Sequence, residues 1–282
     1  MRFFRSLCTM LAVACSVLLL DSCVGIGGGM GPITKKDVVF TPAHWPQEIP
    51  GNVFRPETGD KLPAVLLIHG GVKIGDDGRW LMNGIGRKLS DRGYYVLNIT
   101  YRNVRDWKYP SQLRDVQAAI RWMREHAEKE GIDPDRIAVW GYSAGGYLGE
   151  LAALSKGVDD VQVKAIVAGA APSDLIVYSN GRLIRDHLGG EGDYERRIDE
   201  ASPIMHVTKN SPPTFLYHGT DDKLVKPEHT SGLAQALGRE GVVNEVFWLH
   251  GKGHISTFFG QDEAVDAAMD FLDRHLKGRR DP

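Results

Sequence analysis

Ser143 lies at the centre of the segment GYSAG, residues 141–145, which joins an apolar run at residues 137–140 to an apolar helical pattern at residues 144–154. The G-x-S-x-G spacing has a steric reason, because a serine on a sharp strand-to-helix turn needs neighbours without side chains at positions −2 and +2. Such a turn directs the serine hydroxyl away from the edge of a sheet. The segment therefore predicts a nucleophilic serine, which requires a base within hydrogen-bond reach.

Two histidines and two aspartates near the ends of the last apolar runs are candidates for the partners of Ser143. We favour His254 over His250 as the base, because His254 lies in a glycine-rich loop that can reach the serine, whereas His250 closes a strand. The adjacent Asp221 and Asp222 both follow a strand. We expect Asp221 to be a solvated turn carboxylate.

The elements that must position these residues alternate between strand and helix patterns along the chain. Continuous apolar runs predict buried strands of a parallel sheet at residues 64–68, 94–99, 137–140, 165–169, 214–218 and 245–249. Apolar residues at helical spacing predict helices at residues 84–92, 111–130, 144–154, 228–240 and 264–276. This alternation predicts an α/β fold with a doubly wound, mostly parallel sheet flanked by helices.

Three further segments fit at the margins of this fold. Residues 38–40 and 52–55 are expected to add antiparallel strands at one edge of the sheet. Residues 174–206 interrupt the alternation, and a helical pattern within them predicts a small lid insertion over a site. This insertion is rich in arginine, aspartate and glutamate, so we expect a polar lid rather than the long apolar lid of a lipase.

From about residue 53 to residue 275 the sequence resembles the α/β-hydrolase family, in its small His-Gly-Gly esterase branch related to hormone-sensitive-lipase-like and feruloyl-esterase-like enzymes. The segments that carry the resemblance stand in the family's order along the chain. They are His69-Gly70-Gly71, Tyr101-Arg102 with Pro110, Asp115 and Trp122, the GYSAG segment, His218-Gly219-Thr220-Asp221-Asp222, and Gly251-Lys252-Gly253-His254.

The resemblance implies a catalytic triad of Ser143, Asp222 and His254, with an oxyanion hole formed by backbone amides of Gly70, Gly71 and Ala144. His69 and His218 are expected to support loops rather than to transfer protons. The sequence departs from the family at Val72, where a third glycine is common, and at Lys226, where a proline is common.

The activity implied is that of a cofactor-independent serine esterase, which cleaves short-acyl carboxylic esters through an acyl-enzyme. Acetyl or feruloyl esters of carbohydrate are the substrates that the resemblance suggests. Two alternatives remain open: a serine peptidase of the prolyl-oligopeptidase type, and a non-catalytic surface module on a hydrolase scaffold.

The N-terminal segment is typical of an exported bacterial protein. Arginines followed by an apolar run at residues 7–20 predict a signal peptide at residues 1–22. Leu20-Asp21-Ser22-Cys23 resembles a lipobox, so we expect lipidation of Cys23 and attachment to a membrane through that lipid alone. Residues 23–36 then form a glycine-rich tether, and residues 37–280 form the hydrolase domain with the lid at residues 174–206.

Composition excludes several other classes of protein. The 34 basic and 36 acidic residues give a net charge of −2, which provides no electrostatic field for nucleic acid. The three cysteines all fall within the first 23 residues, which leaves the domain without a disulfide or a thiolate metal site. The histidines show no metal-ligand spacing on a helix, so neither a metal nor another cofactor is expected. The sequence does not predict an oligomeric state.

Overall fold

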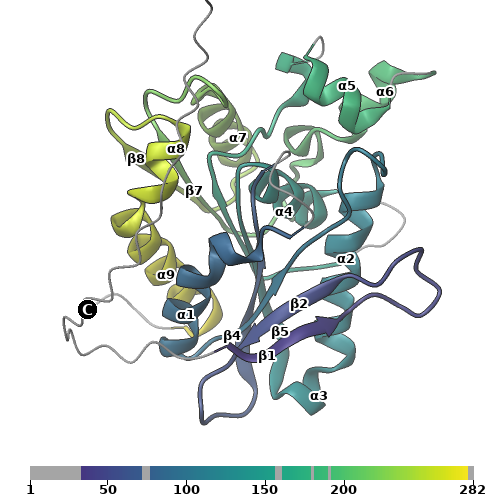
Figure 1. Cartoon of the computed structure of the whole chain (residues 1–282). Coiled ribbons are helices and arrows are strands. Elements are labelled where there is room, and N and C mark those ends of the chain that lie inside the picture. The colour runs from purple at the N-terminus through teal and green to yellow at the C-terminus, as the bar shows by residue number, and fades with distance from the viewer. Residues whose placement is uncertain (1–32, 72–76, 156–160, 179–180, 190–191, 279–282) are drawn as a thin grey trace, which may run out of the picture.

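The computed structural model describes residues 33–71, 77–155, 161–178, 181–189 and 192–278. Its central element is an eight-stranded sheet in the order β1-β2-β4-β3-β5-β6-β7-β8 (Figure 1). The strands are β1 (Ile33–Val39), β2 (Pro50–Phe54), β3 (Leu62–Ile68), β4 (Tyr95–Ile99), β5 (Ile132–Tyr142), β6 (Ala165–Gly169), β7 (Thr214–Gly219) and β8 (Asn244–Leu249). The pairs β1–β2 and β2–β4 are antiparallel, and the pairs from β4–β3 through to β7–β8 are parallel. The predicted α/β fold class is thereby confirmed.

Helices cover both faces of this sheet. The α-helices are α1 (Asn83–Asp91), α2 (Ser111–Glu125), α3 (Ala127–Glu130), α4 (Ala144–Leu154), α5 (Arg182–Leu188), α6 (Tyr194–Glu200), α7 (Glu228–Arg239), α8 (His254–Phe259) and α9 (Asp262–Leu276). The 3₁₀ turns are η1 (Arg79–Met82), η2 (Leu175–Tyr178) and η3 (Pro203–His206). Apolar residues of α1 and α9 form the core on one face, and those of α2, α4 and α7 form the core on the other. Every residue of β3 is buried, as is typical of a parallel strand covered on both sides.

The register of the parallel strands brings distant loops together at one edge of the sheet. Ile68 pairs with Gly141, so the His69-Gly70-Gly71 loop leaves the sheet beside Ser143. Gly219 pairs with Leu249, so the loop with Asp222 leaves beside the loop that precedes His254. Because the carboxyl ends of these strands coincide, residues far apart in sequence meet there.

Four sequence predictions need correction. Instead of one helix over residues 111–130, α2 ends at Glu125 and the short α3 follows, because the backbone of His126 leaves helical geometry with φ −100° and ψ 12°. The His126 ring stacks on Trp122 at this break. The strand expected at residues 137–140 is the last part of the longer β5. His254 begins the helix α8 instead of lying in a loop.

The fourth correction concerns the start of the domain. Residues 33–36, expected in the tether, belong to β1, which pairs with β2 and is fixed by a hydrogen bond from the Thr34 hydroxyl to the Val53 carbonyl (3.1 Å). The expected antiparallel edge strands are present in β1 and β2.

The predicted signal peptide, Cys23 and the rest of the tether lie outside the described residues. Within the described part of the chain, no helix has the length and apolar character needed to cross a bilayer.

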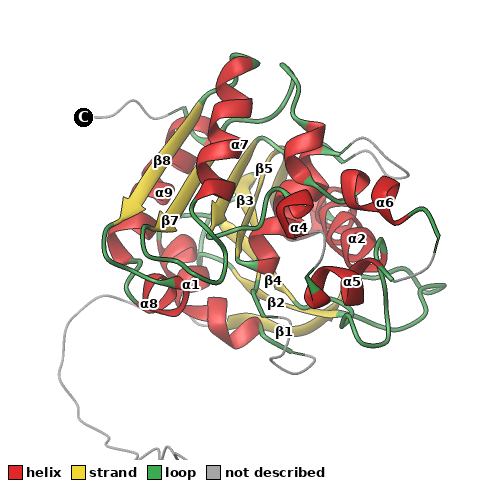
Figure 2. Cartoon of the chain, turned by 90° about the horizontal axis from the view of Figure 1, so that it is seen from above, coloured by secondary structure: helices red, strands yellow, loops and turns green. Residues whose placement is uncertain are grey.

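The insertion at residues 174–206 contains α5 and α6 between the turns η2 and η3. Figure 2 shows α5 and α6 on the side of the sheet that α2 and α4 cover. Leu188 and Ile198 are buried and anchor these short helices to the core, whereas most of their charged residues are exposed. The insertion is therefore a small polar cap on a packed base.

Candidate active site

Ser143 occupies a strained turn between β5 and α4. Its backbone has φ 53° and ψ −122°, a conformation that L-residues rarely adopt. A Cβ added to Gly141 would lie 2.2 Å from the Gly145 carbonyl carbon, and one added to Gly145 would lie 2.1 Å from the Ile68 carbonyl oxygen. Both positions therefore require glycine, which accounts for the spacing of the motif.

Ser143, His254 and Asp222 form one continuous hydrogen-bonded chain. His254 Nε2 lies 2.9 Å from Ser143 Oγ, and His254 Nδ1 lies 2.6 Å from Asp222 Oδ2. With Asp222 ionised, Nδ1 carries the proton and donates it to the carboxylate, so Nε2 accepts the hydrogen bond from the serine hydroxyl. The structure thus brings together the serine, histidine and aspartate expected from the sequence, in the geometry of a nucleophile, a base and an orienting acid.

The environment of Asp222 keeps its carboxyl group ionised. Burial alone would raise its pKa, but hydrogen bonds from His218 and His254 and from the Val225 amide together hold the pKa well below its usual range. Asp222 Oδ1 accepts hydrogen bonds from the Leu224 and Val225 amides, both at 2.9 Å. A carboxylate held in this way orients His254 and stabilises an imidazolium without taking its proton.

His218 supports Asp222 more directly than the sequence indicated. His218 Nε2 lies 2.9 Å from the Val225 carbonyl oxygen, so this nitrogen carries a proton, and it also lies 3.2 Å from Asp222 Oδ2. The Thr230 hydroxyl donates to Nδ1 over 2.6 Å. His218 therefore fixes the acid loop from beneath and contacts the carboxylate itself.

The alternative acid and base do not take part in this chain of hydrogen bonds. Asp221 is exposed and accepts a hydrogen bond from the Thr220 hydroxyl at 3.2 Å. His250 is exposed and is the first residue of the turn after β8. The geometry thus favours Asp222 and His254 over their neighbours.

The loop after β3 approaches Ser143 closely. A Cβ on Gly70 would lie 2.7 Å from the Tyr142 carbonyl oxygen and 3.1 Å from Ser143 Cβ, and Gly71 has φ 101°. Ala144 is the first residue of α4, so its amide has no carbonyl partner within the helix and lies at the positive end of the helix dipole. Gly70 therefore lies against the serine and Ala144 follows it in the chain, while Gly71 is the next residue of the loop and Val72 lies outside the described residues.

His69 holds this loop through a network of buried contacts. Its Nδ1 lies 3.0 Å from the Gly70 carbonyl oxygen, its Nε2 lies 3.1 Å from Thr100 Oγ1, and its ring stacks on Tyr101 at 4.7 Å. Burial lowers the pKa of His69, which favours the neutral ring. These contacts agree with the expected supporting role.

Comparison with known proteins shows which family has this arrangement. Residues 52–237, about two thirds of the chain, match the BD-FAE family. The chain belongs to the BD-FAE family.

Curated relatives of this BD-FAE member are esterases. Esterase LipC of Mycobacterium tuberculosis is 29% identical over 193 residues, which are 62% of this chain and 48% of LipC. Isoprenylcysteine alpha-carbonyl methylesterase ICME of Arabidopsis thaliana is 24% identical over 244 residues, which are 76% of this chain and 57% of ICME. The chain therefore spans about half the length of these relatives.

Solved structures share the fold of this BD-FAE member. A truncated carbohydrate esterase from gut microbiota superposes with a TM-score of 0.78 at 23% identity, covering 86% of this chain and 96% of that one. A thermophilic esterase of Thermogutta terrifontis, Est2, has a TM-score of 0.72 at 22% identity and covers 86% and 92% of the two chains. These similarities establish an α/β-hydrolase fold.

The remaining BD-FAE motif residues have structural contacts. Arg102 forms a buried ion pair with Asp115, with 2.6 Å between Nη2 and Oδ1, and Trp45 Nε1 donates to the same carboxylate oxygen at 2.9 Å. The Arg102 guanidinium also lies over the Trp107 ring, with Cζ 4.8 Å from its centroid. This cluster fixes the chain between β4 and α2.

Two hydrogen bonds near the site join segments whose contact the sequence did not predict. The Tyr142 hydroxyl donates to the His254 carbonyl oxygen at 2.6 Å and so fixes the start of α8 from the strand that carries the serine. Tyr147, one helical turn after Ser143, has its hydroxyl 3.1 Å from His187 Nε2 in α5. Burial lowers the pKa of His187 to about 4, so the ring is neutral at pH 7. The lid is thus connected to the helix that follows the serine.

Proposed function

We propose that this chain is a serine esterase that hydrolyses short-acyl carboxylic esters through a covalent acyl-enzyme. The observation that carries the proposal is the hydrogen-bonded sequence Ser143–His254–Asp222 on a strained, glycine-flanked turn. The BD-FAE membership and the esterase relatives support the same class of reaction.

In the proposed mechanism, Ser143 Oγ attacks the ester carbonyl carbon while His254 Nε2 takes the hydroxyl proton. The resulting oxyanion accepts hydrogen bonds from the Ala144 amide and from amides of the Gly70-Gly71 loop. His254 then returns the proton to the departing alkoxide, which leaves an acyl group on Ser143. A water molecule, deprotonated by His254, hydrolyses this ester by the same steps and regenerates the serine.

For the substrate we propose acetyl or feruloyl esters of carbohydrate. The insertion at residues 174–206 is short and most of its charged residues are exposed, and its apolar surface is divided among single exposed side chains such as Val177 and Met205. This favours a short acyl group on a polar alcohol. The fold is shared with a carbohydrate esterase, and this resemblance supports the choice of alcohol.

A substrate panel distinguishes this function from the alternatives. Nitrophenyl acetate, acetylated sugars and feruloyl esters are expected to be cleaved, whereas a prolyl amide is expected to resist. Preferential cleavage of the prolyl amide would indicate a peptidase of the prolyl-oligopeptidase type. Failure of the folded chain to react with a fluorophosphonate probe would indicate a non-catalytic module.

We also propose that the chain is exported and held on a membrane by a lipid on Cys23. The proposal rests on the apolar run at residues 7–20, the Leu20-Asp21-Ser22-Cys23 segment and the glycines that follow it. The strand β1 begins at Ile33, so the nine residues 24–32 would separate the lipid from β1.

A further inference from the structure

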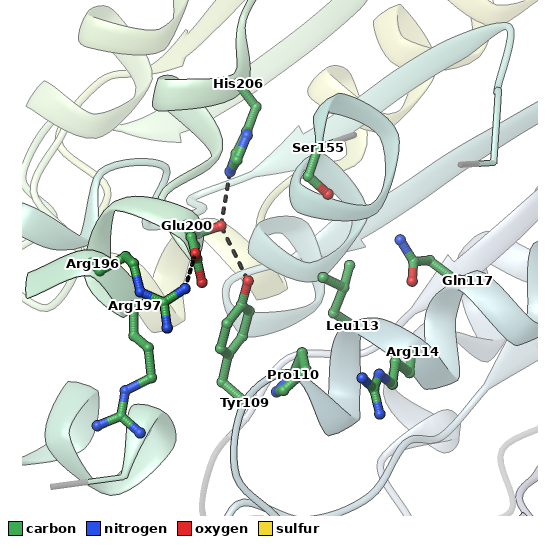
Figure 3. A pocket seen from close by; sticks show the side chains of 10 residues that line it. All are labelled: Tyr109, Pro110, Leu113, Arg114, Gln117, Ser155, Arg196, Arg197, Glu200 and His206. Atoms are coloured by element: carbon green, nitrogen blue, oxygen red, sulfur yellow. Dashed lines mark hydrogen bonds and ion pairs between the residues drawn. The ribbon is translucent and has the colours of Figure 1, made fainter. Parts of the chain in front are cut away.

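A cavity of about 450 Å³ lies between the lid helix α6 and the body of the domain. Its apolar lining comes from Tyr109, Pro110 and Leu113 at the start of α2, as Figure 3 shows. None of the three proposed triad residues lines it. It also reaches Ser155, just beyond the end of α4. Ser143 precedes the start of the same helix, about 18 Å away at 1.5 Å per residue.

The charges around this cavity are mainly positive, although the chain as a whole is slightly acidic. Three arginines, Arg114, Arg196 and Arg197, line it together with one carboxylate, that of Glu200. Arg196 already pairs with Glu200, with 2.6 Å between Nη1 and Oε1. Among the described residues, no carboxylate lies within ion-pair distance of the exposed Arg114. Arg114 is therefore available for an anion from solution.

Arg114 also acts electrostatically on the cavity wall. Burial raises the pKa of Tyr109 to about 12 and Glu200 adds to the rise, while the positive charge of Arg114 opposes it. The guanidinium thus influences the ring that forms one side of the cavity. An anion bound between them would be attracted by the same charge.

Gln117 supplies a second polar group with the properties of a ligand contact. It is only 2% exposed, and its carboxamide faces the cavity from α2 in Figure 3. No hydrogen bond joins this amide to another described residue. The Gln117 amide atoms are not fully buried, so they border the open cavity, where a solvent molecule or a ligand group can form the hydrogen bonds that the amide needs. Arg114 and Gln117 are three residues apart and so project from the same face of α2.

We propose that this cavity is a binding site for a small ligand that carries a carboxylate or a phosphate group. The anion accepts paired hydrogen bonds from the planar Arg114 guanidinium and one from the Gln117 amide. Tyr109 and Leu113 contact the ligand's less polar face. Such a ligand would lie on α2 where α6 also lines the cavity, at a point separate from the ester site.

The test is calorimetric titration of the full chain carrying Ser143→Ala, which removes the proposed hydrolysis but leaves this cavity intact. Glucuronate and inorganic phosphate serve as the two anionic probes, and glucose serves as the neutral control. We expect saturable binding of at least one anion and none of glucose. Comparison of the two anions identifies which group the site prefers.

Variants then locate the binding. Arg114→Ala and Gln117→Leu are each expected to weaken anion binding at least about tenfold. Arg114→Lys keeps the charge but loses the planar pair of donors, so it should also weaken binding, and it avoids any folding defect of the buried Gln117 variant. Arg87→Ala, in α1 on the other face of the sheet, removes the same charge elsewhere and should change nothing.

Absence of saturable binding for both anions would overturn the proposal, as would equal binding of glucose. Anion binding that is unchanged by Arg114→Ala and by Arg114→Lys would place the anion elsewhere and overturn it as well. Because the titration uses the Ser143→Ala chain, its failure is distinct from a failure of the proposed esterase activity.

Discussion

At the scale of single residues, side chains of the same type that lie close together in the sequence have different contacts in the proposed active site. Asp222 and Asp221 are neighbours in sequence, yet only Asp222 contacts His254, at 2.6 Å, while Asp221 is exposed. The same holds for His254 and His250, of which only His254 contacts the serine. Residues of the same type that are one to four positions apart can therefore differ completely, one in the proposed triad and the other exposed to solvent.

Asp222→Asn should lower kcat/KM by about 10⁴-fold, because an amide cannot hold His254 in the tautomer that accepts the serine proton. Asp221→Asn removes a carboxylate of the same size from the adjacent position and should have little effect. Steady-state kinetics with nitrophenyl acetate measures both. If Asp221→Asn were the more damaging change, the assignment of the acid would be wrong by one residue.

At the scale of elements, the helix α4 begins directly after Ser143 and also contains a buried carboxyl group. Glu150 in α4 is fully buried, and the Ser173 hydroxyl is the one side chain that favours its ionised form, more weakly than burial opposes it. Burial raises its pKa from about 4.5 to about 8, so the folded protein keeps a proton that the unfolded chain has released. Stability should consequently fall as pH rises from about 4.5 to about 8, and should show no further loss from this group at higher pH.

Glu150→Gln removes this dependence while keeping the shape of the side chain. Its gain in free energy of unfolding over the parent, measured by denaturant titration, should grow between pH 4.5 and pH 8 and then level off. The upper limit is about 5 kcal/mol at 1.36 kcal/mol per pKa unit. Glu240→Gln, at an exposed position, is the control and should show no such trend. A gain from Glu150→Gln that stays constant across pH would contradict the proposed protonation state.

The elements also show how far the sequence predicts the structure. The buried parallel strands were predictable because long apolar runs between glycine-containing turns have few other interpretations. The helix α8 was not, since the glycines before His254 suggested a loop. One signal was available: Ser256, at the third helical position, accepts a hydrogen bond from the Gly253 amide at 2.8 Å, as in a capping box.

Other features depend on tertiary contacts that sequence patterns do not contain. The break after α2 lies at His126, whose backbone leaves helical geometry, although the spacing of the apolar residues predicts a continuous helix. The Tyr147–His187 contact joins residues 40 positions apart, and the sequence does not predict where the lid helix packs. In contrast, the proposed triad could be expected from the sequence. Ser143 and His254 each follow a strand at the same edge of the sheet, and the family resemblance implies Asp222 instead of its neighbour Asp221 as the acid.

At the scale of the whole molecule, substrate size and location depend on the parts that surround the fold. Short-acyl esters should be preferred, because additional methylenes contribute about 0.8 kcal/mol each only where apolar surface receives them. We therefore expect kcat/KM to fall steeply from acetyl and butyryl to octanoyl nitrophenyl esters, with no activation at an oil–water interface. Rates that rise through decanoyl would instead show that exposed side chains such as Leu224 and Ile255 receive a long chain.

Membrane attachment should depend on one residue. A multiply acylated Cys23 would bind a bilayer stably, because two or more chains bury many methylenes. Cys23→Ser should then release the enzyme into the soluble fraction while leaving kcat/KM of the released domain unchanged. Detergent-phase partition of the two forms measures this. A parent protein found only in the soluble fraction would contradict the lipid anchor.

The most direct test of the central claim is to identify the residue that carries the acyl group. The chain is mixed rapidly with nitrophenyl acetate, quenched in acid and digested, and the acetylated peptide is identified by mass spectrometry. The account predicts a burst of nitrophenol of about one equivalent, with the acetyl group on Ser143, and loss of both in Ser143→Ala. Turnover without an adduct on Ser143, or turnover that survives Ser143→Ala, would contradict it.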